Sequence, residues 1–174
     1  MTILRTIFSG VAAIAIAVTL AGPLRATDVS MNNGSVKFAV PNDWVDILDT
    51  QGDPEVHVYQ VPDPSPTGKL ALARVTVTVK SITDIASFQQ YVGKSSAKAM
   101  VLTGYKADAA VPGVNSYSYT AQESGVQYSY SEHYWMKDGH AVQLRCARPQ
   151  QSDAGPAWKA SFDRSCESIA AKLK

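Results

Sequence analysis

The chain has 174 residues, the length of one domain with a substantial hydrophobic core. Its 16 basic and 15 acidic residues nearly balance, and lysine and arginine form no run that could follow a phosphate backbone. With no nucleic-acid motif in the sequence either, we expect no nucleic-acid partner.

The first 26 residues have the pattern of a cleavable secretory signal. Arg5 supplies the positive charge, and the uncharged apolar run Ile7–Ala21 follows it. A run of about 15 residues is shorter than the roughly 20 needed to cross a bilayer, so we expect no stable membrane anchor after cleavage. Cleavage could follow Ala21 or Ala26, and no cysteine is placed there to carry a lipid. The sequence therefore predicts a periplasmic or secreted protein.

Residues 27–35 are polar and contain asparagine and glycine, so we expect a flexible lead-in before a single domain over residues 36–174. Short alternating segments separated by turn residues then predict an antiparallel sheet. The expected strands are Val36–Val40, Trp44–Leu48, Val56–Val61 and Leu70–Val79, followed after a helix by Tyr105–Val111, Val114–Ala121, Val126–Met136 and Ala141–Ala147.

Two segments have helical periodicity. From Asp84 to about Leu102 apolar residues recur at helical spacing, and Thr83 is placed to cap the first turn. Pro156 suits the start of a second amphipathic segment that reaches Leu173. The order β(4)-α-β(3–4)-α predicts an α+β fold, with an antiparallel sheet of about seven strands flanked by two main helices.

Three segments carry a resemblance to a known superfamily. They are Phe38–Trp44, where a proline and a tryptophan follow a strand, Asp84–Phe88 at the start of the first helix, and Ala157–Ile169 in the last helix. They resemble the superfamily of the PsbP photosystem proteins and the Ran-binding Mog1 proteins, which also contains small exported bacterial proteins. The resemblance implies an antiparallel sheet flanked by helices, an accessory or binding role, and no catalytic residue set.

Cys146 and Cys166 are the only cysteines, and 19 residues lie between them. This spacing is too long for a redox Cys-x-x-Cys pair, and export favours a disulfide. Cys146 lies in the last expected strand, and Cys166 lies on the apolar stripe of the last helix, four residues after Phe162. We predict that they are bonded; the alternative is two separate buried thiols.

The reversal at residues 137–139 decides which face of the last two strands is buried, because a shift of one residue turns every side chain to the other face. A two-residue loop and a three-residue loop with a glycine bulge are both compatible with the sequence. The two-residue loop pairs Trp135 with Val142 and His133 with Leu144, whereas the three-residue loop pairs Tyr134 with Val142 and Tyr130 with Cys146.

We favour the three-residue loop because it places Tyr130, Tyr134 and Cys146 together on the face that the last helix covers. It leaves His133 and Trp135 on the opposite, solvent-exposed face. A tryptophan exposed beside polar residues is a candidate protein-contact patch, and a tryptophan packed by a loop is the competing interpretation. We interpret the tyrosines as core residues whose hydroxyls reach the rim of the sheet, rather than as a ligand cage.

The sequence contains no recognisable catalytic constellation. Glu132 and His133 are neighbours in a strand and point to opposite faces, which argues against a site formed by Glu132, His133 and His140. The histidines His57, His133 and His140 lie on different strands without the spacing of a zinc site. Many serines occur, but none lies in a Gly-x-Ser-x-Gly elbow. We expect no catalytic residues, no metal site and no cofactor.

These observations favour a non-catalytic, exported binding or accessory protein whose partner is a periplasmic or envelope protein. A secretion-system accessory factor and an immunity factor are examples of this class. Two alternatives remain open, and both also place the protein in the periplasm. One is a small hydrolase with a site around His133, and the other is a carrier of a small ligand in a tyrosine-lined cleft.

Overall fold

A computed structural model of the protein describes residues 25–108 and 115–174. These residues form nine β-strands and two α-helices. The bounds are β1 (Ala26–Met31), β2 (Val36–Pro41), β3 (Val45–Thr50), β4 (Glu55–Gln60), β5 (Arg74–Ser81), α1 (Ile85–Met100), β6 (Lys106–Ala107), β7 (Ser116–Glu123), β8 (Val126–Lys137), β9 (His140–Pro149) and α2 (Gly155–Leu173), with short 3₁₀ turns at Asn32–Gly34 and Pro66–Lys69.

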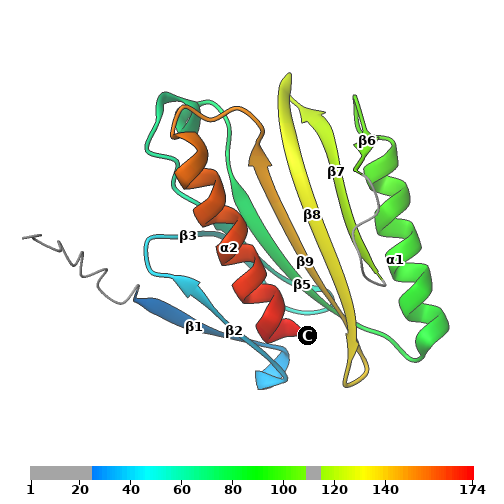
Figure 1. Cartoon of the computed structure of the whole chain (residues 1–174). Helices are drawn as coiled ribbons and strands as arrows, with labels where there is room; N and C mark the ends of the chain where they lie inside the picture. Colours follow the sequence, from blue (N-terminus) through cyan, green and yellow to red (C-terminus); the bar gives the residue numbers. More distant parts are fainter. Residues whose placement is uncertain (1–24, 109–114) are drawn as a thin grey trace, which may run out of the picture.

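Seven of the strands form one antiparallel sheet in the order β3-β4-β5-β9-β8-β7-β6 (Figure 1). Helix α2 crosses one face of this sheet, and α1 packs against β8 and β9 from the opposite face. The strands β1 and β2 form a separate two-stranded sheet that packs against α2. The predicted α+β class, with a seven-stranded antiparallel sheet and two main helices, is confirmed.

The segment expected to be a flexible lead-in is part of the fold. Residues 26–31 form β1, which pairs with β2 along its whole length, and the 3₁₀ turn at Asn32–Gly34 connects the two strands. Met31 is fully buried among the residues that α2 covers. The prediction from composition was wrong because Val29 and Met31 alternate with polar residues, as in a strand with one buried face. The folded part of the chain therefore begins before residue 36.

The hairpin between β8 and β9 has the two-residue loop. Asp138 and Gly139 both have positive φ, 47° and 75°, and Lys137 pairs directly with His140. Loops of this kind match the right-handed twist of the flanking strands, and their left-handed residues favour Asp-Gly. The three-residue register that we favoured from the sequence is wrong, and the pairs are those of the alternative: Trp135 with Val142 and His133 with Leu144.

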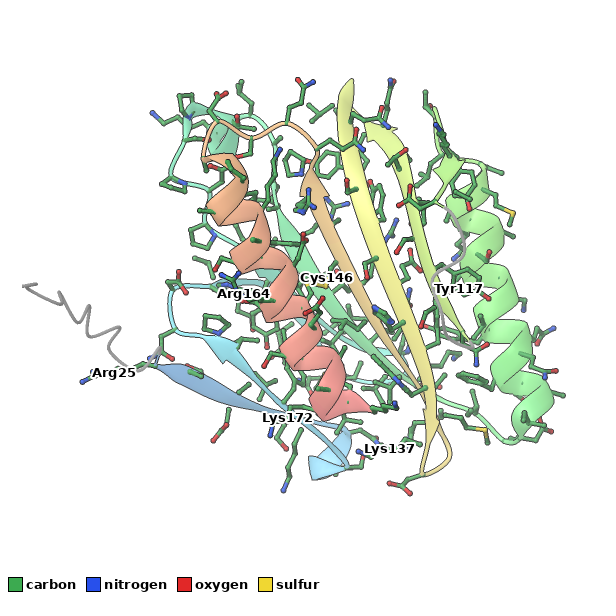
Figure 2. The ribbon with its side chains drawn as sticks, viewed as in Figure 1. Arg25, Tyr117, Lys137, Cys146, Arg164 and Lys172 are labelled. Carbon is green, nitrogen blue, oxygen red and sulfur yellow. A yellow bond between two sulfur atoms is a disulfide. The ribbon has the colours of Figure 1, made fainter. Side chains whose placement is uncertain are left out.

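This register distributes the side chains differently from our expectation. Cys146 does face α2, as predicted, but His133 shares that face with it because the paired residues of adjacent strands point the same way. Tyr130 and Tyr134 point to the other face, where they pack with α1 and its flanking residues. The tyrosines are core residues, as predicted, but they lie on the opposite side of the sheet from Cys146. Tyr117, their neighbour on β7, lies on the side of α1 (Figure 2).

The larger core lies between the sheet, α2 and the β1-β2 pair. The alternating valines of β5 contribute one buried face, as the sequence predicted. The apolar residues of α2 recur at helical spacing and form a stripe that faces the sheet. The opposite side of the helix is left to solvent. The α2 residues in this core are Phe162, Cys166, Ile169 and Leu173.

Helix α1 begins one residue later than the sequence suggested. Asp84, rather than Thr83, is the N-cap, and its carboxylate accepts a hydrogen bond of 2.7 Å from the backbone N–H of Ser87. This bond satisfies one of the free N–H groups of the first turn. The helix ends at Met100 and buries Phe88 and Val92 against β8 and β9.

Two expected strands are shorter in the structure. The strand predicted over Leu70–Val79 begins only at Arg74, and of the strand predicted over Tyr105–Val111 only Lys106–Ala107 is present as β6. The remainder of that second prediction reaches into residues 109–114, which lie outside the described part of the chain. In the described ranges, no helix has the length and apolar character needed to cross a membrane.

Cys146 of β9 and Cys166 of α2 form a disulfide, with their α-carbons 6.5 Å apart. Cys146 lies between the helix and the sheet in Figure 2. The bond joins residues 20 positions apart, and it links the centre of the sheet to the middle of the helix that covers it. The predicted pairing is therefore confirmed, and the alternative of two separate thiols is excluded.

Breaking this disulfide should lower the free energy of unfolding by about 3 kcal/mol, because closing a loop of this length restricts the unfolded chain. Urea unfolding of the native protein, with and without a reductant, measures the effect. The variant with both Cys146→Ala and Cys166→Ala is the control, since its unfolding midpoint should not respond to the reductant. If the midpoint of the native protein stays unchanged while both thiols become alkylatable, the disulfide does not stabilise the fold.

Candidate functional site: a polar groove beside α2

Helix α2 leaves part of its face of the sheet uncovered. In Figure 1 the helix lies over β5 and β9, while β8 and β7 continue beyond it without a covering helix on that side. A groove of about 420 Å³ runs between α2 and these uncovered strands. Apolar atoms of Tyr130, Phe162 and the disulfide form part of its lining. The other lining residues have polar side chains: Asp108, Ser118, Ser129, Ser131, His133, Arg148, Asp163 and Glu167.

Small hydroxyl side chains form the floor of the groove on β7 and β8. Because side chains alternate along a strand, the serines and threonine of both strands point to the same face. Cross-strand pairing then places the hydroxyls side by side, and short side chains leave this face open. The pairs are Ser118 with Ser131, Thr120 with Ser129, and Ser116 with His133.

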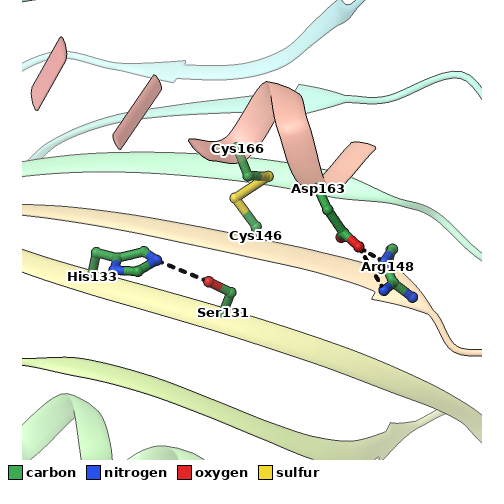
Figure 3. Close-up of a disulfide and its surroundings, with 6 residues drawn as sticks. All are labelled: Ser131, His133, Cys146, Arg148, Asp163 and Cys166. Carbon is green, nitrogen blue, oxygen red and sulfur yellow. Dashed lines mark hydrogen bonds and ion pairs between the residues drawn. A yellow bond between two sulfur atoms is a disulfide. The ribbon is translucent and has the colours of Figure 1, made fainter. Parts of the chain in front are cut away.

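His133 lies at one end of this hydroxyl surface, between two serines. Its Nδ1 is 3.0 Å from the Ser116 hydroxyl. Its Nε2 is 3.0 Å from the Ser131 hydroxyl (Figure 3). Burial lowers the pKa of His133, so the neutral imidazole is favoured at pH 7. A neutral imidazole has one N–H donor and one acceptor. One serine therefore accepts from the ring while the other donates to it.

The other wall of the groove is α2, which two links hold to β9. The disulfide is the first, and the second is a bidentate pair in which Arg148 donates to Asp163 at 2.9 and 3.0 Å (Figure 3). Asp163 and Cys166 are three residues apart, so both links leave the helix from the same side. The partly exposed ion pair contributes little stability alone, but the two contacts together fix the helix beside the serine surface.

The groove lacks the complete arrangement of a hydrolase. The distance between the Ser131 hydroxyl and His133 Nε2 would suit a nucleophile and its base. The second nitrogen of His133, however, is bonded to the Ser116 hydroxyl, and within the described residues no carboxylate forms a hydrogen bond with the ring. Both nitrogens are thus already occupied, which also makes His133 a poor metal ligand. The arrangement is suited to hydrogen-bond recognition.

His133 and Trp135, the two residues predicted to form an exposed contact patch, lie side by side, but both are partly buried. His133 lines the groove, but it lies on the face of Cys146 and not on the opposite one. Trp135 is only partly exposed; it stacks on His133 with ring centres 5.8 Å apart and packs against the large core. The competing interpretation, a packed tryptophan, describes it better. Sequence reasoning missed Ser116 and Ser118, although the alternation of serine with tyrosine in that strand signalled a polar face.

On the opposite face of the sheet, Glu132 is the centre of a buried polar network. It is only 3% exposed, forms an ion pair with Arg145 at 3.1 Å, and accepts hydrogen bonds from the hydroxyls of Tyr119 and Tyr134. Burial and the Glu132 carboxylate both raise the pKa of Tyr119, which keeps the phenol protonated as a donor. Glu132 and His133 thus point to opposite faces, as predicted, and the tyrosines serve this network in the core.

Comparison with known proteins shows the fold and no more. No family model matches the chain, and no curated protein matches it in sequence. A solved structure of PA94 from Pseudomonas aeruginosa, described as a protein of unknown function and suggested to be a regulator, matches with a TM-score of 0.51 and 14% identity over 83% of this chain and 95% of that one. LpqN of Mycobacterium tuberculosis, described as involved in cell envelope biogenesis, matches with a TM-score of 0.49 and 12% identity over 83% of this chain and 87% of that one.

These comparisons name neither PsbP nor Mog1 proteins, so that resemblance stays a prediction. Identities this low show only a shared arrangement of helices and strands. The function of the groove must therefore be argued from its own residues.

The lowered pKa of His133 predicts a pH dependence of stability. The unfolded state takes up a proton near the ordinary pKa of about 6.5, whereas the folded state resists protonation, so the stabilisation is complete above that value and is lost as the pH falls below it. The free energy of unfolding, measured in urea, should be lower at pH 5.5 than at pH 7.5. The His133→Gln variant, which can keep hydrogen bonds to both serines, should show a smaller difference. An equal difference in both proteins would contradict the assignment.

Proposed function

We propose that this chain is an exported, non-catalytic accessory protein that binds a segment of an envelope or periplasmic partner protein in the groove beside α2. The observation that carries the proposal is the open hydroxyl surface next to a helix that is covalently fixed to the sheet. Since the groove has no complete catalytic set among the described residues, binding is the activity that its chemistry supports best.

Two features support export. The first 26 residues have the charge and hydrophobicity pattern of a secretory signal. The Cys146–Cys166 disulfide suits an oxidising compartment, because such bonds are rare in proteins of the reducing cytosol. Both features are consistent with a periplasmic or secreted location.

The geometry of the groove suits an extended peptide. Residues two apart on a strand are separated by roughly 6.8 Å, which is also the repeat of an extended backbone. Ser129 and Ser131 on β8, and Ser116 and Ser118 on β7, follow this repeat. Each hydroxyl can both donate and accept, so it can bond either an N–H or a C=O of a peptide. A protein segment is therefore the ligand class that the hydroxyl surface favours.

Site-specific photo-crosslinking in the producing organism tests the proposal. A photoreactive phenylalanine analogue at Ser118, a half-buried position that lines the groove, should capture a distinct envelope or periplasmic protein. The same analogue at Ser168, on the exposed side of α2, is the matched control and should not capture it. Ser118→Trp, which fills the groove, should weaken binding of the captured partner at least tenfold. Identical products at both positions, or binding that Ser118→Trp leaves unchanged, would contradict the proposal.

A hydrolase with Ser131 as nucleophile and His133 as base is the second candidate, because their side chains lie at hydrogen-bond distance. Turnover of ester, peptide and glycoside substrates by the native protein, lost in both His133→Ala and Ser131→Ala, would support it. A protein without turnover whose partner binding weakens in His133→Ala supports the binding role instead.

A further inference from the structure

Four ionisable side chains gather at the opposite edge of the sheet, on β3 and β4. A bulge in β3 between Asp46 and Leu48 lets Asp46 pair with Tyr59 and Asp49 pair with His57. Residues three apart on a regular strand point to opposite faces, so it is the bulge that brings both aspartates to the face of His57. Bulges of this kind commonly re-aim side chains at functional sites.

His57 is buried without a complete set of partners. The residue is 7% exposed, and its Nε2 has no hydrogen-bond partner within the part of the chain that the structure describes. Its Nδ1 lies 3.3 Å from the Tyr59 hydroxyl and 3.7 Å from Asp46 Oδ2. Leaving a buried polar atom unpaired costs free energy, so the unpaired Nε2 calls for a ligand.

The free nitrogen faces carboxylate oxygens. Nε2 is 3.5 Å from Asp49 Oδ1 and 3.5 Å from Glu55 Oε1. Two ligand atoms of one tetrahedral ion, each bonded at about 2.1 Å, are about 3.4 Å apart. Asp46, Asp49 and His57 each offer one ligand atom, and these three atoms lie within 4.8 Å of one another. The two 3.5 Å separations from Nε2 match the spacing of two ligand atoms on one ion, whereas Asp46, whose contact with the ring is to Nδ1, must move closer to Nε2 to bind the same ion.

We propose that His57, Asp49 and Asp46 bind a divalent transition-metal ion, with Glu55 as an additional carboxylate within reach. An imidazole combined with carboxylates suits zinc and its neighbours in the first transition row better than calcium or magnesium, which prefer oxygen ligands alone. The side chains of Asp46 and Asp49 are 43% and 47% exposed, so the ion can enter from solvent.

Neighbouring groups hold the imidazole in the orientation that a metal needs. The Tyr59 hydroxyl lies within hydrogen-bond distance of Nδ1 and can accept a hydrogen bond from Nδ1–H. This tautomer leaves the lone pair on Nε2 for the metal, as is usual for ligand histidines. Glu55 is held through its second oxygen, Oε2, which accepts a hydrogen bond of 2.7 Å from the backbone N–H of Asn32. Its Oε1 remains directed at His57.

A simpler alternative is that His57 pairs with the surrounding carboxylates alone and binds no ion. Isothermal titration calorimetry of the untagged, metal-stripped protein with Zn²⁺ distinguishes the two. We expect one ion per chain, and affinity at least tenfold weaker in both His57→Gln and Asp49→Asn. Matched controls are His133→Gln, a histidine in the groove, and Asp43→Asn, an exposed aspartate in the turn before β3; both should bind as the native protein does.

Absence of binding by the native protein would overturn the proposal, and so would equal affinity in the native protein and Asp49→Asn. Asp49 is half exposed, so its substitution should leave the fold intact even if His57→Gln does not fold. X-ray absorption of the zinc-loaded protein provides a second readout, with nitrogen and oxygen neighbours expected at about 2.0–2.2 Å. Sulfur neighbours would contradict the site.

Discussion

The two-residue turn at Asp138–Gly139 is the constraint on which the rest of the structure depends. Because side chains alternate along a strand, the turn decides which face of the sheet each residue of β8 points to, relative to β9. The pairing of β7 with β8 then sets the faces of the β7 residues. The turn directs the serines and His133 toward α2 and the tyrosines toward α1. The polar groove and the buried network around Glu132 are thus two consequences of one local geometry.

The disulfide holds α2 beside the serine surface, and this placement of the helix forms the groove. It fixes α2 over β9 and β5, next to the serine surface of β7 and β8 and not on top of it. Small side chains on the uncovered strands leave space, while the covered strands carry valine and leucine. The small residues therefore lie where no helix covers this face, and the larger apolar residues lie under α2. Such consistency between local sequence and tertiary packing is expected of a natural fold.

Much of the architecture could be predicted from residue patterns, and the limits of that prediction have physical causes. The alternating valines of β5, the helical spacing of Phe88 and Val92, and the two cysteines indicated a strand, a helix and a disulfide that the structure contains. The register of the last hairpin could not be predicted, because both loop lengths satisfy the local sequence and only the packing of two faces against two helices selects one. Strand β1 was missed because pairing with β2 outweighs its polar composition.

The candidate sites were harder to predict than the fold. His133 was identified as a site residue, but its serine partner Ser116 comes from β7, and no register between β7 and β8 was predicted from the sequence. The cluster around His57 could not be predicted from the sequence for a different reason. The spacing of histidines alone predicts no metal site, and the bulge that turns Asp46 and Asp49 to one face has no clear signature in the sequence.

Nuclear Overhauser effects between the α-protons of β8 and β9 test the central claim most directly, because these protons approach closely at alternate cross-strand pairs. The two-residue turn predicts such contacts between Tyr134 and Gln143 and between Glu132 and Arg145. Contacts between the α-protons of Trp135 and Ala141, or of His133 and Gln143, would instead indicate the three-residue loop. That result would move His133 away from Leu144 and contradict both the groove and the division of faces described for this protein.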